Sequence, residues 1–159
     1  IRSEHLIKKY KKSLIIRTNF FGFSSKDNPT FSDKIIFDSK KNRKTYLWGD
    51  VYFTPVYVGN LIKIINFLIQ RKKIGIYNIS STECVSKYNF GIKISKILNL
   101  KNKIFKNKLD KNLFVNRPNY MCTSNTKLIR EYPVLKKNLS LRAQLNNLKK
   151  DFSKFRKIY

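Results

Sequence analysis

The chain has 159 residues, of which 42% are hydrophobic and 14% aromatic, and one domain of this size can bury a core. No run approaches the roughly 18 consecutive apolar residues that span a membrane, so this composition excludes a transmembrane helix. The chain opens at Ile1 without a signal peptide, and we expect it to begin inside a longer, cytoplasmic protein.

The net charge of +26 has two interpretations. Lys and Arg can neutralise the phosphates of a nucleic acid, which makes a basic nucleic-acid-binding protein the alternative function. However, the cations are spread along the whole chain, with only short clusters at Lys8–Lys12, Lys40–Lys44 and Lys101–Lys111. The abundance of Lys, Asn and Ile is typical of codon bias in an AT-rich genome, where these residues accumulate at surface positions that tolerate substitution. We favour this second interpretation.

The residues that commonly carry catalysis or bind metals are sparse. Cys84 and Cys122 are far apart and have no partners at metal-ligand spacing, so we predict reduced, partly buried thiols in a cytosolic protein. His5 is the only histidine and is expected on the surface. No Ser-His-Asp set, Gly-rich phosphate loop, paired acidic motif or zinc-ligand spacing is present, and we predict no catalytic residue and no metal site.

Hydrophobic periodicity predicts alternating strands and helices. Ser86 is expected to cap one helix, with Val85 packing on Phe90. A strand, a helix and another strand in this order imply a crossover between parallel strands. The predicted strands are Ser13–Thr18, Thr45–Trp48, Gly75–Ile79 and an edge strand at Ile104–Phe105; the predicted helices are Phe31–Ser39, Val58–Gln70, Ser86–Asn99, Thr126–Glu131 and one starting at Ser140.

Asn19 directly follows the first predicted strand, and Gly22 is expected to permit a turn with positive φ. In open α/β sheets, ligands bind at the carboxyl ends of the strands. Asn19 is therefore a candidate ligand contact, although its amide could equally cap a turn.

The stretch from Asp50 to Leu68 predicts a loop that turns into a buried helix, and Pro55 holds Thr54 in an extended conformation. Two interpretations stand. The stretch is either a core helix after a turn, or a loop whose Asp50, Tyr52 and Thr54 line a polar pocket above that helix.

Taken together, these segments resemble the C-terminal half of an extended short-chain dehydrogenase/reductase that acts on a nucleotide-linked sugar. Within that group they are similar to the dTDP-4-dehydrorhamnose reductase-like proteins. The matching segments are Ile16–Gly22, Asp50–Leu61, Gly75–Ser81, Val85–Gly91, Arg117–Pro118, Thr126–Leu128 and Leu139–Leu141.

The resemblance implies an α/β fold in which residues 1–159 form one partial domain. That domain would be an incomplete Rossmann-type fold with a small α/β substrate-binding region. The glycine turn that cradles the cofactor diphosphate and the Tyr-x-x-x-Lys pair of this family are missing here. NAD(P) is therefore expected for the full-length family and not for this chain alone. The implied partners are a nucleoside-diphosphate sugar and the missing N-terminal half or a second copy of the chain.

Four residues are candidate substrate contacts through the same resemblance. Asn19 matches an Asn that commonly contacts the substrate nucleotide, and Arg117 matches an Arg that commonly clamps its diphosphate. Tyr52 and Thr54 belong to the same region by resemblance. The rhamnose-pathway reductases tend to carry Gln and Gly where this chain has Val51 and Phe53, so reductase, epimerase and dehydratase all remain open.

Overall fold

The computed structural model describes residues 4, 6–7, 9–10, 12–24, 28–109 and 118–155. These residues form short strands and helices in alternation. The strands are β1 (Leu14–Arg17), β2 (Asn19–Phe21), β3 (Lys44–Trp48), β4 (Tyr52–Phe53), β5 (Pro55–Tyr57), β6 (Gly75–Asn78), β7 (Val85–Ser86), β8 (Lys103–Asn107) and β9 (Tyr120–Met121). The helices are α2 (Phe31–Lys40), α3 (Val58–Gln70), α4 (Lys87–Ile97), α5 (Thr126–Glu131), α6 (Lys136–Leu139) and α7 (Leu141–Phe155), with a 3₁₀ turn at Pro133–Leu135.

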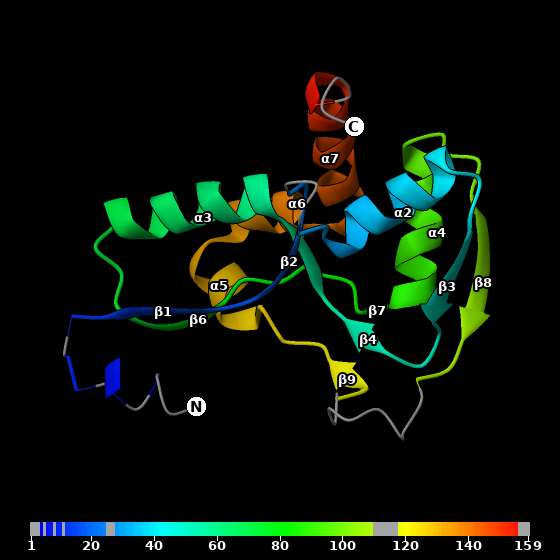
Figure 1. Cartoon of the computed structure of the whole chain (residues 1–159). Coiled ribbons are helices and arrows are strands. Elements are labelled where there is room, and N and C mark those ends of the chain that lie inside the picture. The colour runs from blue at the N-terminus through cyan, green and yellow to red at the C-terminus, as the bar shows by residue number, and fades with distance from the viewer. Residues whose placement is uncertain are drawn as a thin grey trace.

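Most of the strand pairs are parallel. β1 pairs with β6, β2 with β5 and β3 with β8, while β4 lies between β7, which is antiparallel to it, and β9, which is parallel. Figure 1 shows α3 along the β1–β6 pair and α2 with α4 beside the β3–β8 pair, on the other side of the molecule. The predicted strand before α3, β3, pairs with β8, and the strand after α3, β6, pairs with β1, so these two strands are not partners across α3.

Local sequence explains where the two helices beside β3 begin. Thr30 and Asp33 form a capping box at α2, in which the Thr30 hydroxyl accepts from the Asp33 amide and the Asp33 carboxylate accepts from the Thr30 amide. At α4, the Ser86 hydroxyl accepts a hydrogen bond from the Asn89 amide at 3.1 Å, which confirms the predicted cap. Asn99, just past α4, takes the left-handed conformation that commonly closes a helix.

Two hydrophobic clusters form the core. The first, which we call the α4 cluster, is centred on Phe90 and holds the buried residues Phe21, Ile35, Ile36, Leu47, Phe53, Tyr57, Val85, Phe90, Ile94, Leu98, Leu141, Leu145 and Leu148. The second, the α3 cluster, holds Val56, Leu61, Ile64, Leu68, Tyr77, Ile79, Leu128, Leu135 and Leu139.

The predicted strands and helices are all present, with ends that differ by one or two residues. One backbone prediction is wrong: Gly22 does not have a positive φ, and Gly75 is the glycine that does in the described part of the chain. Gly22 is needed for a different reason, because a Cβ there would stand 2.6 Å from Val58 Cγ1 at the start of α3. No helix among the described residues is long and apolar enough to cross a membrane.

Candidate functional site

A cavity of about 320 Å³ opens beside Asn19, where β2, β4 and the starts of α2 and α4 meet. Aromatic side chains form most of its wall, and Phe90 at its base packs edge-on against Phe21 and Phe53, with ring centroids 4.8 and 5.2 Å apart. The residues that line it are Thr18, Asn19, Phe20, Phe21, Phe31, Phe53, Lys87 and Phe90. We call it the Asn19 pocket.

Two polar side chains of this pocket retain hydrogen-bonding capacity. The Asn19 amide nitrogen donates to the Met121 carbonyl at 2.8 Å, which fixes the carboxamide, and its oxygen accepts no hydrogen bond from the described residues. The Thr18 hydroxyl is buried and has no partner among the described residues. A buried hydroxyl without a partner carries a desolvation cost, which a ligand that binds it would relieve.

Lys87 brings positive charge to the pocket from the first turn of α4. Its ammonium lies 5.1 Å from the centre of the Trp48 ring and 5.7 Å from that of Phe31. Contact with both ring faces holds this cation close to the cavity wall. Sequence reasoning missed both Lys87 and Trp48, although each adjoins a predicted feature: Lys87 follows the Ser86 cap, and Trp48 ends a predicted strand.

This set of side chains suits binding better than catalysis. Aromatic walls accept a flat ring, the ammonium attracts a phosphate, and the free amide oxygen and the buried hydroxyl give orientation. None of the described lining residues is a His, Tyr, Cys, Asp or Glu that could act as a general acid or base near neutral pH. No group of three or more potential metal ligands occurs in the described part of the chain.

The other candidates from the 50–54 stretch lie around this pocket and do not line it. Side chains alternate along a strand, so Phe53 faces the cavity while Tyr52 and Thr54 point elsewhere. Tyr52 is 40% exposed, and Thr54 is buried with its hydroxyl 3.2 Å from that of Thr123. The Asp50 carboxylate accepts the Leu109 amide at 3.0 Å, which is a structural contact.

Arg117, the predicted diphosphate clamp, lies outside the described residues. The chain is described again from Pro118, and β9 follows at once, paired with β4. The carbonyl that fixes Asn19 belongs to Met121 in this strand. The segment after Arg117 is therefore attached directly to the pocket.

The prediction of reduced thiols is wrong, because Cys84 and Cys122 form a disulfide. They stand 38 residues apart in sequence, but β4 pairs with β7 on one side and β9 on the other, and the two Cα atoms lie only 5.7 Å apart. Spacing along the chain could not reveal this pairing. The bond anchors the residue between Met121, which holds Asn19, and Thr123, which contacts Thr54.

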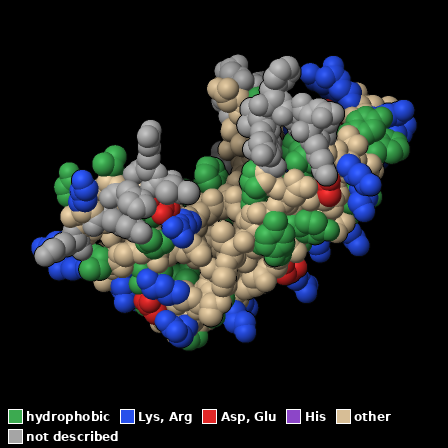
Figure 2. Space-filling view, turned by 90° about the horizontal axis from the view of Figure 1, so that it is seen from below, with side chains coloured by type: hydrophobic (Ala, Val, Ile, Leu, Met, Phe, Trp, Pro, Cys, Tyr) green, Lys and Arg blue, Asp and Glu red, His purple; other side chains and the backbone are tan. Residues whose placement is uncertain are grey.

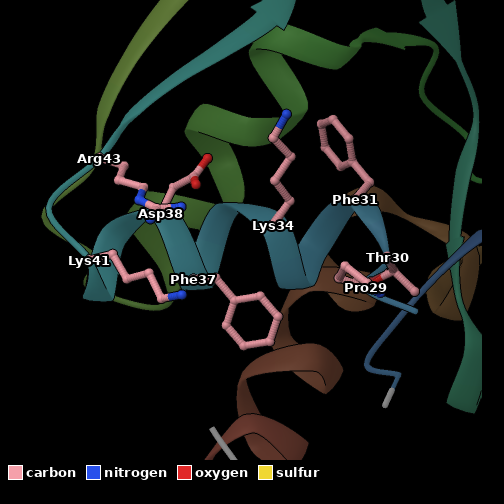
Figure 3. Close-up of a pocket in the computed structure, with 8 residues that line it drawn as sticks. All are labelled: Pro29, Thr30, Phe31, Lys34, Phe37, Asp38, Lys41 and Arg43. Atoms are coloured by element: carbon pink, nitrogen blue, oxygen red, sulfur yellow. The ribbon is translucent and has the colours of Figure 1, made fainter. Parts of the chain in front are cut away.

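A second cavity of similar size lies along the outer side of α2, where Lys34, Lys41 and Arg43 surround Phe37 and Asp38. Figure 3 shows Lys34 and Phe37 pointing away from the helix in different directions. The Asp38 carboxylate is already engaged, since it accepts from the Thr45 hydroxyl at 3.1 Å. These side chains do not converge on one point, and we assign no ligand to this cavity.

The most strongly shifted titratable group lies away from both cavities. Burial, together with a 2.7 Å hydrogen bond to Glu131, raises the pKa of Tyr77 to about 12. The same hydrogen bond lowers the pKa of Glu131, which also lies 3.5 Å from the Lys73 ammonium. These contacts tie α5 to β6, and we interpret them as structural.

The chain matches solved structures of sugar-nucleotide enzymes. It superposes on the NADP complex of a dTDP-4-dehydrorhamnose reductase from Bacillus anthracis with a TM-score of 0.73 and 25% identity, covering 95% of this chain and 51% of that one. A dTDP-4-dehydrorhamnose reductase from Clostridium acetobutylicum gives a TM-score of 0.77 and 20% identity, covering 96% and 52%.

An epimerase shares the same fold. The UDP-N-acetylglucosamine 4-epimerase of Methanobrevibacter ruminantium, in complex with UDP-N-acetylmuramic acid, gives a TM-score of 0.64 and 15% identity, covering 91% of this chain and 49% of that one. No protein-family model matches the sequence, and no curated protein matches it.

The chain spans about half the length of these solved structures. The α/β fold with parallel strand pairs and the resemblance drawn from the sequence motifs are both confirmed. The chain therefore has the fold of about half of an extended short-chain dehydrogenase/reductase of the dTDP-4-dehydrorhamnose reductase kind.

Proposed function

We propose that this chain binds a nucleoside-diphosphate sugar, as the substrate-binding half of an NAD(P)-dependent sugar-nucleotide reductase or epimerase. The observation that carries the proposal is the Asn19 pocket, in which a flat aromatic wall, one cation and two unsatisfied polar groups converge. The base would lie against Phe31, and Lys87 would attract the diphosphate. Arg117 would be a second, bidentate phosphate contact, as the family resemblance implies.

The described residues do not fit the nicotinamide cofactor itself. A cofactor diphosphate binds at a helix N-terminus whose amides are free. Here the side chains of Thr30 and Ser86 cap α2 and α4. At α3, the Gln144 side chain accepts the Tyr57 amide. We therefore propose that this chain alone does not bind the cofactor or transfer hydride.

The missing functions would come from a chain or segment that carries the other half of the fold. In the described part of the molecule β1 has β6 as its one partner strand, so the opposite edge of β1 has no strand beside it. Parallel sheets are normally extended and covered on both faces, so a parallel pair this short favours an additional neighbour. A cofactor-binding half that adds a parallel strand here would complete the sheet. Self-association through the same side is the alternative for the isolated chain.

Nucleic-acid binding, the alternative raised by the charge, has less support. Figure 2 shows Lys and Arg side chains along the left, lower and right margins of the face in view and not gathered into one patch. Recognition of a phosphate backbone uses a basic patch or stripe on one surface. The scattered charge agrees with codon bias.

The test is calorimetric titration of the chain with dTDP-glucose, compared with Asn19→Ala and Lys87→Met. Met is an unbranched side chain of similar length that lacks the positive charge. We expect each variant to weaken binding about tenfold, as charged or neutral hydrogen bonds of roughly 1–3 kcal/mol predict. Lys63→Met on α3, which removes an exposed cation elsewhere, should leave affinity unchanged.

Arg117→Ala and Arg117→Lys extend this test to the diphosphate. Ala should weaken binding about tenfold, and Lys should restore only part of it, because it lacks the planar fork. Equal affinity of the wild type and the pocket variants Asn19→Ala and Lys87→Met would overturn the proposed site. Turnover of a keto-sugar nucleotide by the chain alone would overturn the proposal that this chain binds the substrate and does not transfer hydride.

A further inference from the structure

A groove of about 470 Å³ lies between α4 and α7, on residues that take no part in the Asn19 pocket. Its floor is apolar: Leu141 and Leu145 are buried there, and Ile97 is half-buried. Its rims are basic on both sides. The residues that line it are Glu83, Lys93, Lys96, Ile97, Asn99, Leu141, Arg142, Leu145, Asn146 and Lys149.

Helical spacing explains this combination of floor and rims. On α4, Lys93 and Lys96 are three residues apart and therefore share a side of the helix. On α7, Arg142 and Lys149 are separated by two turns and share a side as well. Each helix thus contributes a row of cations to its own rim of the groove.

The four cations, Lys93, Lys96, Arg142 and Lys149, form no ion pair within the described part of the chain. Among the described residues that line the groove, Glu83 is the one with a carboxylate. Unpaired lysines are common on a chain of charge +26, and alone they would mean little. What distinguishes the groove is that two basic rims flank one apolar hollow.

We propose that this groove is a docking site for an acidic amphipathic helix of a partner protein. A helix laid between α4 and α7 would place apolar residues at i, i+4 and i+7 on the floor formed by Ile97, Leu141 and Leu145. Asp or Glu on both flanks of that stripe would face the cations of the two rims. The apolar floor favours a protein helix over a nucleic acid, whose backbone offers charge and no apolar stripe.

The groove is separate from the proposed sugar-nucleotide site. Lys87 and Phe90, in the first turn of α4, belong to the Asn19 pocket, whereas Lys93 to Asn99 belong to the last turns and the end of the same helix. The proposal therefore does not depend on the proposed function, and a failure of one leaves the other intact.

The probe is a fluorescein-labelled 14-residue synthetic peptide with Leu at helical spacing and Glu on both flanks, followed by fluorescence anisotropy. The first control peptide has the same composition in an order that destroys the apolar stripe. The second has Lys in place of Glu. We expect the acidic amphipathic peptide to bind the full chain at least tenfold more tightly than either control.

Variants locate the binding. Lys93→Glu combined with Lys149→Glu reverses one cation on each rim at exposed positions, and it should weaken the peptide at least tenfold. Lys40→Glu combined with Lys136→Glu makes the same charge change elsewhere and should weaken it less than threefold. Ile97→Ala leaves the charge unchanged and should also weaken peptide binding. Thermal unfolding of this variant verifies that it folds.

Three outcomes would overturn the proposal. Equal binding of the acidic peptide and its scrambled control would mean simple charge attraction. Equal losses in the two double variants would place binding outside the groove. A short single-stranded oligonucleotide could displace the peptide from the wild type but not from the Lys93/Lys149 variant. That result would assign the groove to a nucleic acid.

Discussion

The two hydrophobic clusters are both buried, but they differ in what lies beside them. The α4 cluster is enclosed by α2, α4, α7 and the strands between them, and its central Phe90 is fully buried. The α3 cluster lies against β1, whose outer edge has no partner strand in the described part. On α3 itself Ile62 and Ile69 are 53% and 58% exposed, two turns apart on one side.

This difference separates the two roles that we propose for the chain. The Asn19 pocket is built on three residues of the α4 cluster, Phe21, Phe53 and Phe90. The exposed Ile62 and Ile69 on α3, together with the edge of β1 that has no partner strand in the described part, form the side on which we propose that a partner docks. Experiments on the isolated chain should therefore find a formed ligand pocket and an unsatisfied docking side.

The largest effect is expected from Phe90→Ala, which removes the ring that Phe21, Phe31 and Phe53 all contact. A cavity of this kind should cost about 3–5 kcal/mol of unfolding free energy, measured by urea denaturation. Leu68→Ala in the α3 cluster should cost less, about 2 kcal/mol, because that side can relax into the cavity. A greater cost at Leu68 would reverse our comparison of the two clusters.

The disulfide should stabilise the pocket side of the molecule. Cys84→Ser combined with Cys122→Ser removes a crosslink between residues 38 apart in sequence. This change should lower the free energy of unfolding by about 3–4 kcal/mol. Affinity for dTDP-glucose should fall as well, because the bond anchors the strand that holds Asn19. The melting temperature of the wild type is measured with and without a thiol reductant, and the double Ser variant shows the value expected for a fully reduced chain. Identical wild-type melting temperatures under the two conditions would contradict a stabilising bond.

Self-association should come from the α3 side. Ile62→Lys with Ile69→Lys places two charges on the exposed side of α3 and should raise the dissociation constant of any dimer at least tenfold, measured by sedimentation velocity. Ile92→Lys on α4, a single change of the same kind at an exposed position beside the α4 cluster, should have no effect. A wild-type chain that is monodisperse and monomeric at high concentration would contradict the prediction.

The smallest effect is expected from Tyr77→Phe, which removes the hydrogen bond to Glu131 and should cost about 1 kcal/mol. Because the pKa of Tyr77 is raised from 10.0 to about 12, its contribution is complete below pH 10 and is lost as the pH rises toward 12. Because the pKa of Glu131 is lowered from 4.5, its contribution is present above pH 4.5 and is lost at lower pH. Stability curves against pH for Tyr77→Phe should be flatter in both windows.

The sequence by itself determined the elements and the family resemblance. Local signals were sufficient for this: hydrophobic periodicity placed α3 and α4, the Ser86 cap fixed the start of α4, and motifs such as Ile16–Gly22 pointed to the right fold. Asn19 was a candidate because it follows a strand, and strand ends are where open α/β sheets bind ligands.

Only the tertiary structure decided which side chains share the pocket and which cysteines pair. Lys87 joins Asn19 from 68 residues away, and Cys84 reaches Cys122 because β4 pairs with strands from two distant segments. Likewise, strand alternation turned Phe53 into the cavity and Tyr52 and Thr54 away from it. Such contacts depend on strand pairing between distant segments and on the face each residue presents, which sequence spacing does not specify.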